Sequence, residues 1–248
     1  MSTRRQRIRR FLLAAIFLAL PITLNYYSPY LMTTGTAARV ASFSLLFWSA
    51  VFVSAFLLGR SFCGWACPFN GLQQLWESVS IRPLKRVRYL PALKYALWAA
   101  WVAAVVGIAI AVGGWERIDL LYLTESGVSI SEAGNLVTYF MLVFLTLLPA
   151  LLGRRGFCRY VCPFGVWGIV AEKVGHAAHL PRLLLRANSS ACTGCGTCTR
   201  ACPMQLPVTE MVQAEKMRAT ECFMCETCAD VCPSKAIGVG FGRATSGR

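Results

Sequence analysis

The chain has 248 residues, of which 56% are hydrophobic, and its formal net charge is +14. A mean hydropathy of +0.53 combined with that charge is unusual for a soluble globular protein and typical of a membrane protein with basic flanks. The positive charge is spread over several segments rather than gathered on one folded face, so we expect no nucleic-acid partner. The composition therefore favours a membrane protein, which is in contact with lipid.

Four apolar stretches are long enough to cross a hydrocarbon core of ~30 Å at a helical rise of ~1.5 Å per residue. They cover residues 11–31, 41–58, 90–112 and 136–152. The sequence therefore predicts four transmembrane helices.

The first stretch could instead be a cleaved signal peptide, because arginines in segment 4–10 precede it. However, the apolar run continues past Pro21 without a small-x-small cleavage site, and Tyr26, Tyr27 and Tyr30 suit an interfacial aromatic belt. We therefore expect an uncleaved first span.

Basic residues in the short loops predict the orientation, because Lys and Arg are retained on the cytoplasmic side. They gather in segments 60–88 and 154–159, whereas segment 28–38 has no charge and segment 113–134 is mostly acidic. We expect a multi-pass protein of the bacterial inner membrane, with both termini and the C-terminal domain cytoplasmic.

A short motif, aromatic-Cys-x-x-x-Cys-Pro-Phe, follows both the second and the fourth predicted span. It supplies Cys63 and Cys67 in the first copy and Cys158 and Cys162 in the second. Two spans separate the copies, so both motifs emerge on the same face. Buried structural cysteines have no reason to repeat at this spacing. The four thiols could hold a further metal or iron–sulfur centre, which we favour, or cycle between dithiol and disulfide.

The other eight cysteines form two copies of the bacterial ferredoxin run C-x-x-C-x-x-C-x-x-x-C-P. In two-cluster ferredoxins the fourth cysteine of each run serves the other cluster. The run therefore predicts one [4Fe–4S] cluster held by Cys192, Cys195, Cys198 and Cys232. It predicts a second held by Cys222, Cys225, Cys228 and Cys202. Zinc ribbons pair two short hooks across a spacer, and disulfides are disfavoured in a reducing cytosol, so neither fits as well.

The predicted fold is an α-helical membrane bundle of four transmembrane helices plus a small α+β two-cluster ferredoxin-like domain. We expect the membrane domain at residues 1–176, a linker at 177–190, the ferredoxin-like domain at 191–240 and a tail at 241–248. His176 and His179 lie near the connector, and we expect them to be solvated or interfacial rather than ligands.

These motifs together resemble the membrane ferredoxin-type proteins of the NapH, NosR and MauN type, over nearly the whole chain. The resemblance implies an inner-membrane electron-transfer subunit that relays electrons between the quinol pool and a partner redox protein, and so a possible quinol dehydrogenase subunit. The chain has neither the flavin domain of NosR-like members nor the C-terminal domain of related oxidase accessory proteins, so we expect it closest to NapH or MauN. The alternative function is an assembly factor that reduces a metal ion or a thiol for a respiratory or periplasmic metalloenzyme.

Overall fold

Proline and glycine residues divide the apolar stretches into helices of unequal length. In a computed structural model, residues 3–79, 83, 87, 89–124, 128–129 and 133–243 are described. The first half contains α1 (Arg4–Leu18), α2 (Leu20–Tyr27), α3 (Pro29–Ala37), β1 (Val40–Ser42), α4 (Phe43–Leu58), α5 (Ser61–Trp65), α6 (Pro68–Val79) and α7 (Pro91–Val112). The second half contains β2 (Arg117–Asp119), α8 (Ala133–Leu147), the 3-10 helix η1 (Leu148–Leu152), α9 (Gly156–Tyr160), α10 (Phe164–Ala177), β3 (Arg182–Ala187), the 3-10 helix η2 (Ser189–Ala191), α11 (Thr197–Ala201), α12 (Val208–Gln213), α13 (Thr227–Asp230) and β4 (Ile237–Gly242).

The first apolar stretch is broken rather than continuous. Helices α1 and α2 meet at an angle of 83° around Ala19, and α3 begins at a second proline, Pro29. Pro21 lies in the first turn of α2 and has no backbone N–H, so it cannot continue the hydrogen-bond ladder of α1. The stretch expected as one span at 11–31 is therefore divided among three helices.

The expected set of four full-length spans is not confirmed. Among the described residues, α7 is the one unbroken helix long and apolar enough to cross a membrane, and the bent α1–α2 pair adds a second if it is taken as one span. Helix α4 has 16 residues and α8 has 15, which is short of the roughly 20 needed. Pro149 lies in η1, where the fourth apolar stretch leaves the α-helical conformation.

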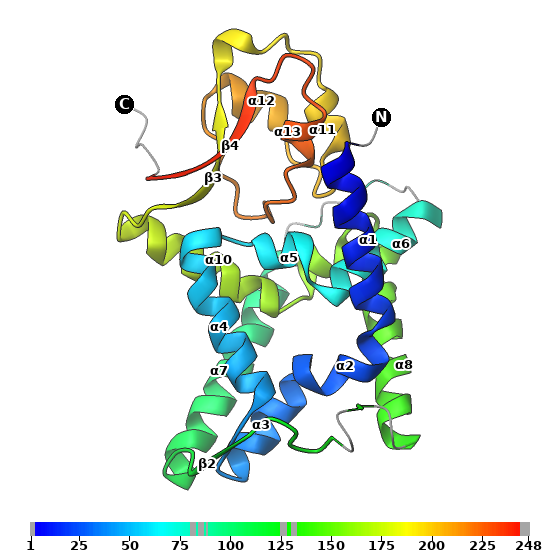
Figure 1. Ribbon diagram of the computed structural model, residues 1–248, viewed down its shortest axis with the longest axis vertical. Helices are drawn as coiled ribbons and strands as arrows, with labels where there is room; N and C mark the ends of the chain where they lie inside the picture. The colour runs from blue at the N-terminus through cyan, green and yellow to red at the C-terminus, as the bar shows by residue number, and fades with distance from the viewer. Residues whose placement is uncertain are drawn as a thin grey trace.

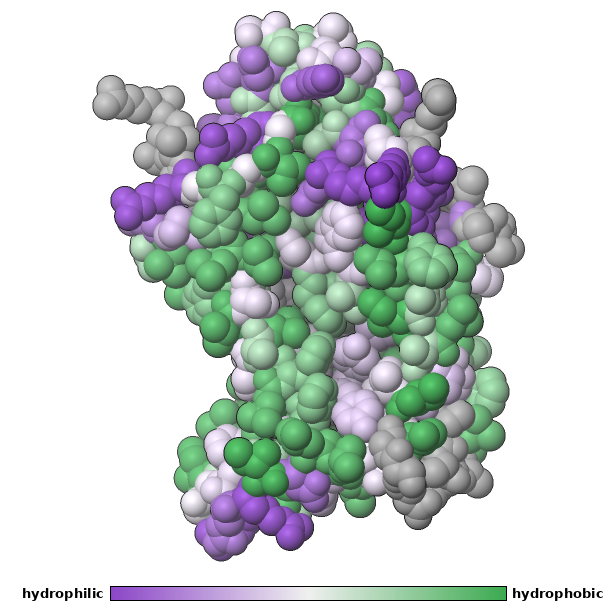
Figure 2. All heavy atoms as spheres, in the orientation of Figure 1, coloured by the Kyte–Doolittle hydropathy of each residue, from purple (hydrophilic) through white to green (hydrophobic). Residues whose placement is uncertain are grey.

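A broad apolar surface surrounds these helices. Of α7, Lys94 and Val105 are the buried residues, whereas Ile110 is 76% exposed and Phe140 and Phe144 of α8 are each 61% exposed. Figure 2 shows hydrophobic residues over the middle of the molecule and hydrophilic residues gathered mainly toward its two ends. Exposed apolar surface of this extent indicates contact with a membrane or another protein.

Aromatic side chains hold the two repeated units together. Helix α4 packs against α10, and the ring of Trp48 stacks on that of Phe164 with centroids 3.8 Å apart. Trp167 of α10 makes edge contacts with Phe52 and Trp98. Aromatic pairs of this kind add to the free energy gained by burial. They bring the helix before the first motif beside the helix after the second motif.

The ferredoxin-like domain is closed by a two-stranded antiparallel sheet. Strand β3 pairs with β4 in the register Leu183↔Phe241 to Ala187↔Ile237, and helices α11, α12 and α13 lie close to these strands (Figure 1). Here the structure differs from the expected boundaries. The segment 177–190, expected as a linker, contains β3, and β4 extends into the segment expected as a tail.

Candidate iron–sulfur sites

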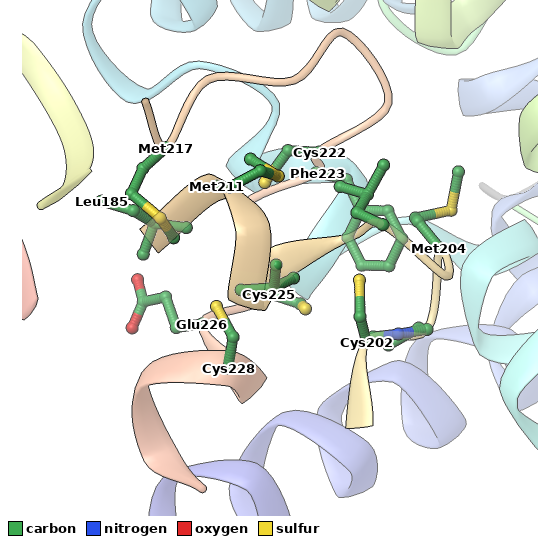
Figure 3. Close-up of a pocket in the computed structure, with 13 residues that line it drawn as sticks. Leu185, Cys202, Met204, Met211, Met217, Cys222, Phe223, Cys225, Glu226 and Cys228 are labelled. Atoms are coloured by element: carbon green, nitrogen blue, oxygen red, sulfur yellow. The ribbon is translucent and has the colours of Figure 1, made fainter. Parts of the chain in front are cut away.

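The second predicted cluster set surrounds one cavity. Its four cysteines line the cavity together with apolar side chains that include Leu185, Met204 and Phe223 (Figure 3): Cys202, Cys222, Cys225 and Cys228. Cys222 and Cys225 come from the loop before α13 and Cys228 from α13 itself, whereas Cys202 comes from the end of the first run. Burial raises the pKa of Cys222 to about 12, so a bound metal must displace its proton. The four thiols match the ligand number of a [4Fe–4S] cluster.

The first predicted set surrounds a second, smaller cavity. Its lining contains Cys192, Cys195, Cys198 and Cys232 together with Val212, Pro233 and Ile237. Gly194 and Gly196 have positive φ angles of 68° and 70°, which let the backbone turn tightly between the first three cysteines. Both cavities thus group the cysteines as the crossed ligand pattern predicts, although the ligand assignment itself stays a prediction.

Cys195 differs from the other cysteines because it is exposed to solvent. Hydrogen bonding to Thr197, with a smaller contribution from Thr193, lowers the pKa of Cys195 to about 7. The first cluster set therefore reaches the surface of the ferredoxin-like domain through Cys195, although its Cys198 is buried like Cys202 and Cys228 of the second set.

The four cysteines of the repeated motifs come together. Cys67 is affected electrostatically by Cys63, Cys162 and Cys158, and Cys67 and Cys162 belong to one buried cluster with Trp48. Burial raises the pKa of Cys158 to about 11 and that of Cys162 to about 12. The parallel repeat thus delivers four thiols to one region between the helices and the ferredoxin-like domain.

Buried cations surround these four thiols. Arg60 acts electrostatically on Cys63, Cys158 and Cys162, and its side chain lies against Gly165 and Gly168 of α10, where any larger residue would crowd it. Arg155 binds the side chain and backbone of Asn70, and the Asn70 amide donates to the Cys63 carbonyl at 2.5 Å.

Two carboxylates partly neutralise the cations. Lys94 Nζ lies 2.6 Å from Glu221, which Arg60 also approaches at 3.8 Å, and Arg155 Nε lies 2.9 Å from Glu77. Three cations are buried beside the thiols: Arg60, Lys94 and Arg155. They exceed the two carboxylates by one positive charge. Buried charge is costly unless it is paired, so this region suits an anionic occupant such as a thiolate-bound cluster.

The first motif touches the second cluster set directly. A Cβ at Gly64 would overlap the Phe223 carbonyl oxygen and lie 3.3 Å from the Cys225 nitrogen. The Trp65 indole donates to the Met224 carbonyl at 3.1 Å, and Cys63 packs against the core of the ferredoxin-like domain. Glycine is required at position 64 for this approach, which explains the Cys-Gly-Trp sequence.

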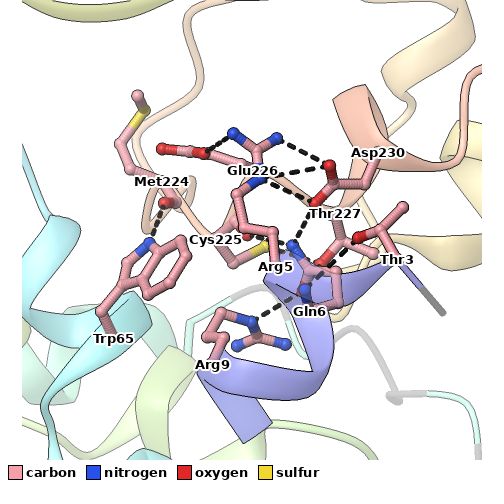
Figure 4. Close-up of polar contacts among 10 residues, drawn as sticks. All are labelled: Thr3, Arg5, Gln6, Arg9, Trp65, Met224, Cys225, Glu226, Thr227 and Asp230. Atoms are coloured by element: carbon pink, nitrogen blue, oxygen red, sulfur yellow. Dashed lines mark hydrogen bonds and ion pairs between the residues drawn. The ribbon is translucent and has the colours of Figure 1, made fainter. Parts of the chain in front are cut away.

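Helix α1 also binds the second cluster loop (Figure 4). Gln6 Nε2 donates to the Cys225 carbonyl at 3.0 Å and to Asp230 at 2.6 Å. Arg5 forms ion pairs with Glu226 at 2.5 Å and Asp230 at 2.8 Å. The sequence indicates only a basic flank at these positions, because no local pattern links residues so far apart.

Arg9 joins the same network one turn further along. It donates to Gln6 Oε1 at 2.8 Å and to the Gly64 carbonyl at 3.2 Å. Helix α1 thus bridges the first motif and the second cluster set.

No group of three or more His, Cys, Asp or Glu side chains in the described part of the chain is arranged to hold a single metal ion. A single zinc ion needs its thiolates converging at ~2.3 Å. The four cysteines of the repeated motifs, called the repeat set below, stay a prediction as a metal or thiol centre. Of the two histidines, His176 lines a groove below the ferredoxin-like domain and His179 is exposed.

Comparison with known proteins matches the two cysteine regions separately. Residues 40–87 and 135–175, which contain the repeated motifs, match the family described as "4Fe-4S binding domain". Residues 191–237 match the family described as "4Fe-4S dicluster domain". The fold and the cysteine sites thus define an iron–sulfur protein of the ferredoxin type.

Similar proteins refine this class. The chain is 27% identical to YccM of Escherichia coli, named for electron transport, over 86% of this chain and 60% of YccM. It is 31% identical to the methylamine utilization ferredoxin-type protein MauN of Methylorubrum extorquens, over 69% and 56%. It is 24% identical to the ferredoxin-type protein NapH of E. coli, over 70% and 59%. No solved structure matches the chain.

The chain is a ferredoxin-type 4Fe–4S protein of the group that includes NapH, NosR and MauN. It spans about three fifths of the length of YccM.

Proposed function

We propose that this protein is a multi-pass inner-membrane relay that moves electrons between the quinol pool and a partner redox protein. The observation that carries the proposal is the succession of three cysteine sets from the apolar helices to the exposed loop at Cys195. The first repeated motif contacts the second ferredoxin set at Gly64. Cys202, a predicted ligand of the second cluster, belongs to the same cysteine run as three ligands of the first cluster.

The membrane placement rests on the exposed apolar surface of α7 and α8. The helices α4 and α8 are short, so four membrane crossings require that some segments contain breaks and 3-10 turns. Such interruptions are tolerated where neighbouring protein groups form the hydrogen bonds that the backbone has lost. Basic segments 60–88 and 154–159 favour the cytoplasmic side for all the cysteines.

The two ferredoxin cavities each offer four thiols for a [4Fe–4S] cluster, which would supply one-electron transfer there. The repeat set is the candidate for a third centre. Its support is the match of both motifs to a 4Fe-4S family and the excess of buried positive charge around the thiols.

Anaerobic purification in detergent tests the proposal. Iron and acid-labile sulfide are counted, and a quinol analogue is added while cluster absorbance and the reduced-cluster paramagnetic signal are followed, with dithionite as the full-reduction reference. We expect reduction by quinol in the wild type. Bleaching by dithionite alone would refute the relay from quinol.

Serine variants separate the second ferredoxin set from the set of repeat cysteines. Cys225→Ser is expected to lower iron content by about one cluster while Cys162→Ser removes the third centre, if the repeat set holds one. An unchanged iron content in the Cys162→Ser variant would show that the repeat cysteines hold no cluster, and would favour the interpretation that they are redox-active thiols.

An assembly factor is the second candidate function, because the four repeat cysteines lie close together. Thiol trapping at controlled redox potential tests it. Reversible loss of two thiols from this set, or binding of cuprous copper, would favour the reductive assembly role over the relay.

A further inference from the structure

A groove lined by both polar and apolar side chains lies between the helical part and the ferredoxin-like domain. Its cavity volume is about 750 Å³, and its lining includes Gly59 at the end of α4, Glu172 and His176 of α10, and Arg182 of β3. Ligand cavities for small organic molecules have volumes of roughly 300–1,000 Å³. The groove is therefore large enough for a ring-sized ligand, and neither family match accounts for it.

The groove reaches the second cluster set. Cys222 lines both the groove and the cavity that the cluster cysteines surround. Glu172 acts electrostatically on Cys222 and on His176. A molecule bound in the groove would thus be separated from the second cluster cavity by Cys222. The Glu172 carboxylate and the His176 imidazole, one helical turn apart, would lie beside it.

Two arginines hold Glu172 in place. Arg182 Nη1 donates to the Glu172 carbonyl at 2.8 Å, and its ion pair with the carboxylate spans 3.9 Å. Arg218 approaches the same carboxylate oxygen, Oε1, at 3.8 Å. The carboxylate is therefore oriented by long ion pairs through one oxygen.

Apolar side chains belong to the lining of the groove itself. They come from β3 and from the segment that leads into the second cluster loop: Leu183, Leu184, Leu185, Met217 and Met224. Phe241 pairs with Leu183 and is 55% exposed. Polar and apolar groups thus meet in one groove, which matches a ligand that has a polar ring and a hydrophobic tail.

We propose that this groove binds the ring of a membrane quinol, with Glu172 and His176 as hydrogen-bond acceptors for its hydroxyl groups. The inference rests on the proposed relay and names the site at which its substrate binds.

Oxidation of a quinol to a quinone breaks two O–H bonds and releases two protons and two electrons. The carboxylate of Glu172 and the imidazole of His176 would receive the two protons. A [4Fe–4S] cluster held in part by Cys222 would supply one-electron acceptance beside the groove, so that the two electrons would leave one at a time. A second class of ligand, an anionic lipid headgroup, would suit the surrounding arginines. However, the leucine and methionine side chains of the lining suit a ring and a hydrophobic tail better than a phosphate, and the Glu172 carboxylate accepts from a hydroxyl, which favours the quinol.

A photoreactive quinone analogue tests the binding site without relying on turnover. The purified full-length protein is labelled in detergent, with and without excess quinol, and the labelled peptides are identified by mass spectrometry. We expect labelling within segments 183–187 and 214–219 that quinol displaces. Labelling confined to other segments, or labelling that quinol does not displace, would overturn the proposal.

Alanine variants with matched controls assign the acceptors. His176→Ala and Glu172→Ala are expected to weaken binding of the analogue by about tenfold, the loss of roughly one strong hydrogen bond. His179→Ala and Glu210→Ala, which change exposed residues outside the groove, are expected to bind as the wild type does. Iron content reports folding of each variant, and His176→Ala carries the test if Glu172→Ala loses its clusters.

The outcomes separate this inference from the proposed relay. If quinol reduces the wild type and equally the His176→Ala variant, the groove is not the quinol site although the relay stands. If quinol does not reduce the wild type, the relay itself fails. Displacement of the analogue by phosphatidylglycerol but not by quinol would assign the groove to a lipid and overturn the proposal.

Discussion

Individual residues decide how closely the three cysteine sets approach each other. Gly64 permits contact with the Phe223 carbonyl. Burial raises the pKa of the Cys158 thiol to about 11 and outweighs Arg155 and Arg60, which lower that pKa. A motif search finds the cysteines themselves, because their spacing is local. It does not find Arg60 or Arg155, whose roles depend on contacts between repeats.

Substitution of Gly64 tests the contact between the first motif and the second cluster set. Gly64→Ala places a methyl group against backbone atoms that cannot rotate away, so we expect destabilisation of roughly 1–3 kcal/mol, the usual cost of overpacking. Thermal unfolding followed by cluster absorbance measures it. Gly107→Ala is the control, since a Cβ there meets nothing within 4 Å, and equal stability of both variants would contradict the contact.

The exposed Cys195 makes a pH-dependent prediction for the metal-free protein. Its pKa of about 7 lies below that of an ordinary thiol, so the thiolate predominates above pH 7 and is lost as the pH falls through that value. Alkylation of Cys195 by iodoacetamide should therefore reach half its maximal rate near pH 7. Cys222, with a pKa of about 12, should stay unmodified over the same range. Equal rates at both cysteines would contradict the assignment.

At the scale of helices and strands, prolines and contacts between distant residues change the elements that the hydrophobic pattern predicts. The apolar run at 11–31 looks continuous, but Pro21 and Pro29 break it into three helices. The segment 177–190 looks like a linker because its partner, β4, lies about fifty residues further on. The helical repeat and the two ferredoxin runs could be predicted, since each is defined by nearby residues, whereas the sheet and the docking of α1 could not.

The network at the start of α1 yields a prediction about domain docking. Gln6→Ala removes the donor to the Cys225 carbonyl and the partner of Asp230, both partly buried, so we expect a cost of roughly 1–3 kcal/mol for the docked state. Amide hydrogen exchange in segment 222–230 should accelerate. Arg7→Ala, which changes an exposed residue of the same helix, should leave exchange unchanged, and acceleration in both variants would point to a general loss of helix instead.

At the scale of the whole molecule, polarity is divided along the long axis. The ferredoxin-like domain lies at one end and the β1–β2 pair at the other, with α4, α7 and α8 between them (Figure 1). Strands β1 and β2 pair in parallel, Val40 with Arg117 and Ser42 with Asp119, and so join the ends of α3 and α7. The apolar middle therefore separates two polar ends, which is the arrangement a membrane protein requires.

Reporter fusions test this placement. A fusion at Gly114, beyond the end of α7, should give alkaline phosphatase activity, which needs the periplasm. A fusion after Arg243 should be inactive as phosphatase and fluorescent as green fluorescent protein. Phosphatase activity at both sites, or at neither, would contradict a membrane position between the two ends.

The pairing of α1 with the second cluster loop has a consequence for biosynthesis. Arg5 and Asp230 are separated by 225 residues, so a ribosome that adds ~5–20 residues per second leaves the first helix without its partner for about 10–45 s. During that interval Gln6 and Arg9 have neither the Cys225 carbonyl nor the Gly64 loop in its final position to bind. The N-terminal end of α1 thus reaches its final contacts only after the ferredoxin-like domain, which is made last, has been synthesised.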